Sequence, residues 1–195
     1  MMMTTGELIE LKRECKATEI PSGVERVLPA GSLVRISQIL GSAYTVLSDL
    51  GYMCRIEASD ADALGLNPPP TGGSSGVQIA FSEQAVWDQL RSIYDPEIPV
   101  NIVDLGLIYG CKITSLDDGK KIDVKMTMTA PGCGMANVLK ADVERKLGQL
   151  TEVKSVQVQV VFDPPWSPSR MSDAAKLQLG LDLDDRGDPM VHISR

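Results

Sequence analysis

One segment near the middle of the chain constrains the fold more than any other feature. Residues 67–77 carry three consecutive prolines followed by a run of glycine and serine. Helices and strands both need backbone N–H groups and restricted backbone angles, which this composition does not supply. The segment therefore predicts a linker between two folded parts, residues 1–66 and residues 78–181. The acidic residues 182–195 predict a flexible tail.

The part before the linker has the pattern of β-strands. Short runs of β-branched and apolar residues are separated by turn signals such as Gly41-Ser42 and Leu50-Gly51. The expected strands are residues 9–11, 25–28, 33–40, 44–47 and 52–56. Because these strands are short and closely spaced, the sequence predicts a small all-β, barrel-like domain.

After the linker the hydrophobic period changes along the chain. Ser82 can cap a helix that ends before Pro96, because the residue before a proline avoids the helical region. Alternating apolar and polar residues then predict strands. The expected elements are a helix from 83 to before Pro96, strands 107–113 and 121–129, a helix 135–150, a strand 154–162 and a short helix 172–177. This α-β-β-α-β order predicts an α+β fold with two layers, in which helices pack on a small mixed sheet.

The charge balance excludes several classes of partner. Lys and Arg total 19 against 26 Asp and Glu, so the formal net charge is −7. Such a chain offers no basic surface to hold nucleic acid or anionic lipid. It has no run of about 18 apolar residues that could span a membrane, and its first residues lack the basic and apolar regions of a signal peptide. We expect a cytoplasmic protein that binds neither nucleic acid nor a membrane.

The histidine and cysteine content excludes several kinds of catalytic and metal site. His192 is the only histidine, so Ser-His or Cys-His dyads and an H-E-x-x-H zinc site have nothing to build on. Cys15, Cys54, Cys111 and Cys133 form no C-x-x-C pair, and we expect free thiols. Cys15 and Cys54 fall among the strand-like runs and Cys111 lies within an expected strand, where an isolated cysteine is usually a small buried hydrophobe. Cys133 remains as the candidate for chemistry.

Two loops of the second part carry residues that could take part in chemistry. In the first loop, Asp95, Glu97 and Asp104 offer carboxylates that could bind a hard metal or hold the loop by accepting backbone N–H bonds. In the second, Cys133 follows a predicted strand and sits at the first turn of a predicted helix. Unpaired N–H groups and the helix dipole favour negative charge there, so we expect a stabilised Cys133 thiolate.

Both loops also have plainer explanations. The run Asp95-Pro96-Glu97 can be only a helix stop followed by a turn. Gly132 and Gly134 can exist only because the backbone turns sharply. Cys133 can be an inert buried residue of a plain interaction domain.

A third explanation belongs to another class of protein. The Gly132-Cys133-Gly134 turn is part of a dinucleotide fingerprint, so a nucleotide-binding or thiol-dependent enzyme is the alternative. Asn137 stands where the third glycine of that fingerprint would be. We also expect no ordinary parallel βαβ unit around the turn, which weakens the alternative.

The two loops together, with the ending Asp163 to Met171 and the helix after it, resemble the SufT group of the PaaD-like domain family. The resemblance covers about residues 80–181 and rests on three motifs in the family's order. These are the acid-proline-acid loop, the run Asp104-Leu105-Gly106-Leu107 and the glycine-cysteine turn at Cys133. The segment Ile9 to Leu66 is similar to the amino-terminal extension of the longer SufT proteins.

The resemblance implies a non-enzymatic auxiliary factor in iron-sulfur cluster assembly. Its partners would be the SUF cluster assembly proteins and the client apoproteins that receive clusters. The family's reactive cysteine falls on Cys133, which is also the implied contact to the metal of a cluster. The supporting loop residues fall on Asp95, Glu97, Asp104, Thr129, Gly132 and Gly134. One position departs from the family, because many relatives have proline where this chain has Gly134.

Counting ligands limits how a cluster could be held. Common clusters use four protein ligands, usually thiolates, and this part of the chain offers one good candidate, Cys133. A cluster could be shared by the two subunits of a homodimer, or Cys133 could contact it transiently during transfer. The protein could also bind no cluster and act as an adaptor. The scarcity of thiols favours the adaptor or the transient carrier.

Overall fold

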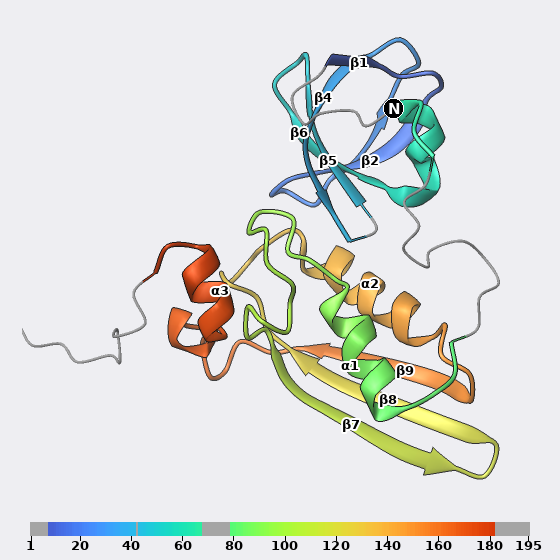
Figure 1. Ribbon diagram of the computed structural model, residues 1–195, viewed down its shortest axis with the longest axis vertical. Coiled ribbons are helices and arrows are strands. Elements are labelled where there is room, and N and C mark those ends of the chain that lie inside the picture. The colour runs from blue at the N-terminus through green and yellow to red at the C-terminus, as the bar shows by residue number, and fades with distance from the viewer. Residues whose placement is uncertain (1–7, 42, 68–78, 182–195) are drawn as a thin grey trace, which may run out of the picture.

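The computed structural model describes residues 8–41, 43–67 and 79–181. These residues form two separate hydrophobic cores, one before residue 67 and one after residue 79. We call residues 8–67 the β unit and residues 79–181 the α+β unit (Figure 1). Nearly all of the predicted linker, and the predicted tail, lie outside the described residues.

The β unit is a six-stranded antiparallel sheet followed by a short helix. Its strand order is β1-β4-β5-β6-β2-β3. The helix η1 contributes four buried side chains, three of them alanines. The elements are β1 (Leu8–Glu10), β2 (Cys15–Glu19), β3 (Glu25–Leu28), β4 (Leu33–Leu40), β5 (Ala43–Ser48), β6 (Met53–Glu57) and η1 (Ala58–Leu64).

The expectation of a barrel is wrong, because the sheet is open. Strands β1 and β3 lie at its two edges, and closure would require them to pair with each other. β1 is three residues long and pairs with β4, whereas β3 pairs with β2. The chain after β1 turns to η1 instead, where the N–H of Lys12 donates to the carbonyl oxygen of Ala63 at 2.8 Å.

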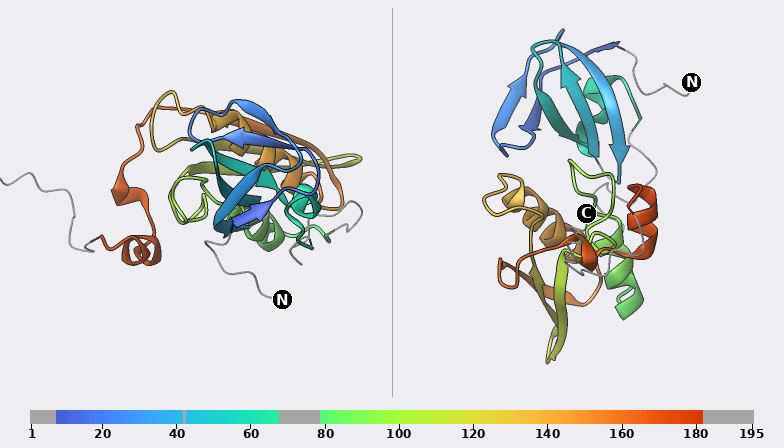
Figure 2. Two further views of the ribbon diagram at one scale, coloured as in Figure 1. Left: turned by 90° about the horizontal axis from the view of Figure 1, so that it is seen from above. Right: turned by 90° about the vertical axis from the view of Figure 1, so that its left-hand side faces the viewer.

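The α+β unit packs helices on a three-stranded sheet, as the sequence predicts. Figures 1 and 2 show α1 and α2 on one face of the sheet, on the side toward the β unit. The elements are α1 (Glu83–Arg91), β7 (Ile108–Leu116), β8 (Gly119–Met126), α2 (Ala136–Leu147), β9 (Val153–Val160), η2 (Pro168–Arg170) and α3 (Asp173–Gln178).

The sheet of the α+β unit is mixed, which confirms the predicted sheet type. β7 and β8 form an antiparallel hairpin, while β8 and β9 run parallel. Because α2 connects β8 to β9, these three elements are a parallel βαβ unit. The expectation that no such unit surrounds the Cys133 turn is therefore wrong. The error came from the antiparallel hairpin, whose pattern gives no sign of the direction in which the third strand pairs.

Local chemistry explains where the helices begin and what they bury. The Ser82 hydroxyl oxygen accepts the N–H of Ala85 at 2.9 Å, so the predicted cap of α1 is confirmed. Helix α2 buries Leu139, Val143 and Leu147 against the sheet. Burying each such side chain contributes roughly 1.5–3 kcal/mol. The sheet and the two helices therefore hold the ends of β8 and α2, and the loop between them, in place.

Candidate functional site

The loop that carries Cys133 connects the end of β8 to the start of α2. The N–H of Thr127 donates to the carbonyl oxygen of Leu107 at 2.8 Å, which joins this loop to the chain entering β7. Gly132 has a φ of 79°, a left-handed value that favours glycine. Thr129 and Cys133 are both half-buried, and Cys133 packs against the edge of the core of the α+β unit.

The Cys133 thiol lies outside the helix, contrary to the sequence-based expectation. α2 begins at Ala136 with Met135 as its cap residue, so Cys133 precedes the first turn. The N–H of Met135 lowers the pKa of the thiol, but burial is the larger effect and raises it. The pKa of Cys133 is raised overall. The expected stabilised thiolate is therefore wrong, and near neutral pH the thiol keeps its proton.

The acid-proline-acid loop faces the Cys133 loop. Asp95 and Glu97 both raise the pKa of Cys133 electrostatically, after the larger effect of its burial, so the fold brings the two loops together. The Asp95 carboxylate is buried, and one of its oxygens accepts the N–H groups of Glu97 and Ile98, each at 2.9 Å. Of the two roles left open by the sequence, Asp95 performs the structural one, because it holds its own loop.

Burial also sets the ionisation of these two carboxylates. The pKa of Asp95 is raised, mainly by burial, although the two N–H bonds oppose that shift. Glu97 is exposed, and its pKa is raised by partial desolvation and by the nearby Asp95. Both acids therefore hold their protons to a higher pH than ordinary carboxyl groups do. A cation near Cys133 would reverse this tendency by favouring the ionised forms.

Asp104 belongs to a different turn. The side-chain amide of Asn101 donates to its carboxylate at 2.6 Å, and the carbonyl oxygen of Asp104 accepts the N–H of Ser172 at 2.8 Å. The indole N–H of Trp166 donates to the carbonyl oxygen of Leu105 at 2.8 Å. These bonds anchor the chain around η2 and α3 on the Asp104 turn. Asp104 therefore supports the fold beside the site, and within the described residues no hydrogen bond joins it to Cys133.

A contact from the β unit is the feature of the site that sequence reasoning missed. A Cβ atom placed on Gly134 would lie 1.9 Å from the carbonyl oxygen of Ser22, in the turn between β2 and β3. A Cβ on Gly23 would lie 2.1 Å from the carbonyl oxygen of Gly134. The one available signal was the glycine at position 134 itself.

A hollow of about 800 Å³ lies apart from the expected site residues. It is lined by residues of all three strands of the α+β unit, including Lys112, Asp123, Lys125 and Gln157. None of the seven expected site residues lines it. Within residues 8–41, 43–67 and 79–181, no three His, Cys, Asp or Glu side chains gather closely enough to hold a metal ion. No helix in the same ranges is long and apolar enough to cross a membrane.

The region that carries the two loops matches a known protein family. The family model for iron-sulfur cluster assembly proteins matches residues 83–160. The chain is 42% identical over 99 residues to the Fe-S protein maturation auxiliary factor of Porphyromonas gingivalis, a match that covers 51% of this chain and 91% of that protein. The chain belongs to the iron-sulfur cluster assembly protein family.

Two further relatives are similar over about half of the chain. The Fe-S protein maturation auxiliary factor YitW of Bacillus subtilis is 35% identical, with 51% of this chain and 94% of the relative covered. SufT of Staphylococcus aureus, also named a maturation auxiliary factor, is 36% identical, with 46% and 98% covered. Each relative is almost fully covered by 99 or fewer aligned residues, which leaves no room in it for a further unit of the size of the β unit.

Two solved structures also match about half of the chain. The DUF59 domain from Bacillus anthracis is 40% identical, covers 51% of this chain and 92% of its own, and has a TM-score of 0.44. A conserved hypothetical protein from Thermotoga maritima is 31% identical, covers 54% and 100%, and has the same TM-score of 0.44.

Proposed function

We propose that this protein is an auxiliary maturation factor that helps deliver iron-sulfur clusters to client apoproteins. The proposal rests on family membership and on the names of the relatives, which are maturation auxiliary factors. One observation carries the assignment of the site: the half-buried thiol of Cys133 lies within electrostatic reach of Asp95 and Glu97. The partners would be SUF cluster assembly proteins and client apoproteins in the cytoplasm.

Cys133 is better suited to handing a cluster on than to storing it. Conventional clusters need four protein ligands. Cys15 and Cys54 belong to the core of the β unit, and Cys111 lies within strand β7. One subunit therefore presents Cys133 as its one loop thiol. We infer that Cys133 contacts the cluster transiently or shares it with a second subunit of a homodimer.

The raised pKa of Cys133 supports a transient contact. A thiol must lose its proton before it binds iron, so metal binding competes with protonation. A thiol with a raised pKa therefore releases metal more readily at a given pH than a stabilised thiolate does. The two acidic neighbours then offer a place where the positive charge of iron is tolerated. This combination supports a protein that passes its cargo on without carrying out a catalysed reaction.

A nucleotide-binding or thiol-dependent enzyme remains the alternative, and one observation favours it. The parallel βαβ unit of β8, α2 and β9 is the setting in which a dinucleotide turn occurs. Against it, the backbone of Gly134 is covered by the carbonyl of Ser22, which would meet a pyrophosphate first. NAD or ATP that raised the melting temperature of the protein would support the alternative.

A complementation experiment tests the proposed function. In cells that lack their own copy, the Cys133→Ala variant should fail to restore the activity of iron-sulfur client enzymes. Cys111→Ala is the matched control, because Cys111 is also half-buried in the same unit but lies in strand β7. Full restoration of client activity by Cys133→Ala would remove Cys133 from the mechanism.

A further inference from the structure

The turn between β2 and β3 meets the Cys133 loop closely through main-chain atoms. Ser22 and Gly23 meet Gly134 so closely that neither glycine has room for a Cβ atom. Gly23 has a φ of 71°, so its own backbone also favours glycine, whereas Gly134 has no positive φ. The requirement for glycine at position 134 therefore comes from the contact with the β unit. Proline at this position could not coexist with the contact.

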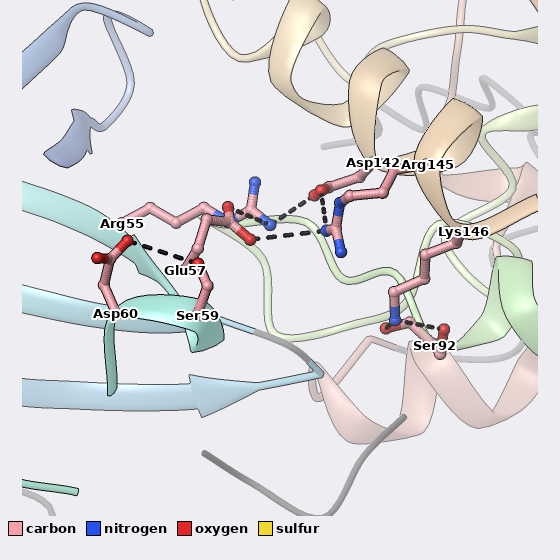
Figure 3. Close-up of polar contacts among 8 residues, drawn as sticks. All are labelled: Arg55, Glu57, Ser59, Asp60, Ser92, Asp142, Arg145 and Lys146. Atoms are coloured by element: carbon pink, nitrogen blue, oxygen red, sulfur yellow. Dashed lines mark hydrogen bonds and ion pairs between the residues drawn. The ribbon is translucent and has the colours of Figure 1, made fainter. Parts of the chain in front are cut away.

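A second turn of the β unit contacts the other loop of the site. Gly41 lies between β4 and β5, and a Cβ placed on it would lie 2.5 Å from the carbonyl oxygen of Ser92. Ser92 ends α1, three residues before Asp95. Its carbonyl oxygen also accepts a bond from the ammonium group of Lys146 at 3.2 Å, as Figure 3 shows. The β unit therefore contacts the Cys133 loop and the end of α1, from which the acid-proline-acid loop starts.

Charged side chains join the two units between these turns. Figure 3 shows Arg55 and Glu57 of the β unit facing Asp142 and Arg145 of α2. The Arg55 and Asp142 side chains are each 8% exposed and form an ion pair, and Arg145 lies 3.6 Å from Glu57. One guanidinium nitrogen of Arg55, Nη1, is buried without a hydrogen-bond partner.

The composition of this contact favours reversible docking. The two hydrophobic cores are separate clusters, so neither core continues across the contact between the units. Burying an ion pair costs desolvation energy that offsets much of its attraction, and the unpartnered nitrogen of Arg55 adds to that cost. Interfaces of this polar kind allow domains to move relative to one another. Because the two units belong to one chain, the β unit stays near the site after it undocks.

We propose that the β unit is a built-in cover that docks over the two site loops and limits access to Cys133, and that it must move aside for a partner to reach the thiol. The cover itself stands on the contacts of Gly134, Gly41 and Arg55, and only the nature of the partner rests on the proposed function. The three relatives described above have the length of the α+β unit alone. The cover is therefore a feature by which this chain differs from them.

Alkylation of Cys133 by N-ethylmaleimide, followed by mass spectrometry of the full chain, tests the cover. Gly134→Ala places a methyl group against the carbonyl of Ser22 and should separate the units. We expect Cys133 to label about tenfold faster, the change that a shift of about 1.4 kcal/mol in the docking equilibrium produces. Gly110→Ala is the matched control, because a Cβ there meets nothing within 4 Å, and its labelling rate should equal that of the wild type.

A second variant loosens the cover from a point outside the Cys133 loop. Asp142→Asn removes the charge that pairs with Arg55 and should also speed labelling, though less than Gly134→Ala does. Asp123→Asn is its control, because Asp123 pairs with Lys121 inside the α+β unit. Small-angle X-ray scattering on the same samples reports separation of the units as a larger radius of gyration.

The outcomes separate the cover from the proposed function. Units that separate while Cys133 labels at the wild-type rate would overturn the cover, and so would Gly134→Ala units that stay docked. Suppose that the units separate in both variants but Cys133 labels faster only in Gly134→Ala. That result would also overturn the cover, because the faster labelling would then be a local effect on the Cys133 loop. Alkylation needs neither a cluster nor a client, so the cover can hold even if Cys133→Ala restores client enzymes fully.

Discussion

The two units of this protein differ in where they place apolar side chains and thiols. The α+β unit buries large side chains in a continuous core, whereas the core of the β unit includes four alanines and two cysteines. Of thirteen exposed large hydrophobic side chains in the described residues, nine lie in the β unit. Cys15 and Cys54 are 3% and 0% exposed in that unit, while Cys133 lies half-buried in a loop. The position of a thiol, more than its presence, decides what it can do.

This difference in core and thiol placement indicates distinct roles for the two units. The α+β unit carries both loops of the proposed site and contains the residues that match the family model. The β unit contacts the α+β unit through two turns that contain glycine and through Arg55, and its own cysteines are buried. A family domain has thus gained a second unit that touches its site without adding a reactive group.

The largest expected effect tests whether the cores are independent. Leu139→Ala in the α+β unit and Leu64→Ala in the β unit each remove a fully buried side chain and should cost about 2–5 kcal/mol. Both tryptophans, Trp87 and Trp166, lie in the α+β unit. Tryptophan fluorescence during urea unfolding should therefore shift strongly with Leu139→Ala and much less with Leu64→Ala. Equal shifts would show that the two units unfold as one.

A smaller effect concerns the loop that Asp95 holds. Asp95→Ala removes the acceptor of two backbone N–H groups and should destabilise the α+β unit by about 1–3 kcal/mol. Asp95→Asn keeps an oxygen in the same place and should cost less. Urea unfolding read by fluorescence checks both variants. If Asp95→Ala is as stable as the wild type, the carboxylate does not hold the loop.

The smallest effect is a pH dependence of opposite sign in the two units. The pKa of Asp95 is raised, so the stability it provides is present below its unfolded pKa and is lost as pH rises through its folded pKa. Asp95→Asn should therefore gain stability relative to the wild type as pH rises above the ordinary pKa of an aspartate.

Asp62 in the β unit provides the contrast. Arg13 donates to it and lowers its pKa, so the stability it provides is lost as pH falls. Asp62→Asn should therefore lose stability relative to the wild type as pH rises toward the ordinary pKa of an aspartate, which is below the range in which Asp95 acts. Urea titrations read by far-ultraviolet circular dichroism at several pH values check both signs. Slopes of the same sign would contradict the assigned environments.

The sequence predicted most elements of the α+β unit because each has a strong local signal. Ser82 marks the start of α1, and alternation marks β7, β8 and β9. In the β unit, β2 was missed because its alternation of Cys15 and Ala17 with polar residues is short. η1 was missed because its buried residues are mostly alanines, which carry little hydrophobic signal. Local sequence patterns predict individual helices and strands. They predict less well whether the strands pair into an open or a closed sheet.

The residues proposed for the site came from the sequence, but their environment could not be predicted from it. The two loops were found from their composition, and the structure brings Cys133, Asp95 and Glu97 together. The raised pKa of Cys133 was not predictable, because burial in the folded chain outweighs the local N–H groups. The contact between Ser22 and Gly134 was not predictable either. The two positions are far apart in the sequence, and neither residue type indicates the other as its partner.

Cluster transfer in vitro tests the role of Cys133 most directly. An apoprotein client is mixed anaerobically with a cluster-loaded SUF scaffold, and the recovery of client activity is followed with wild-type protein, Cys133→Ala or Cys111→Ala. The account predicts that the wild type and Cys111→Ala accelerate transfer equally and that Cys133→Ala leaves it at the rate without the protein. Acceleration by Cys133→Ala equal to that of the wild type would contradict it.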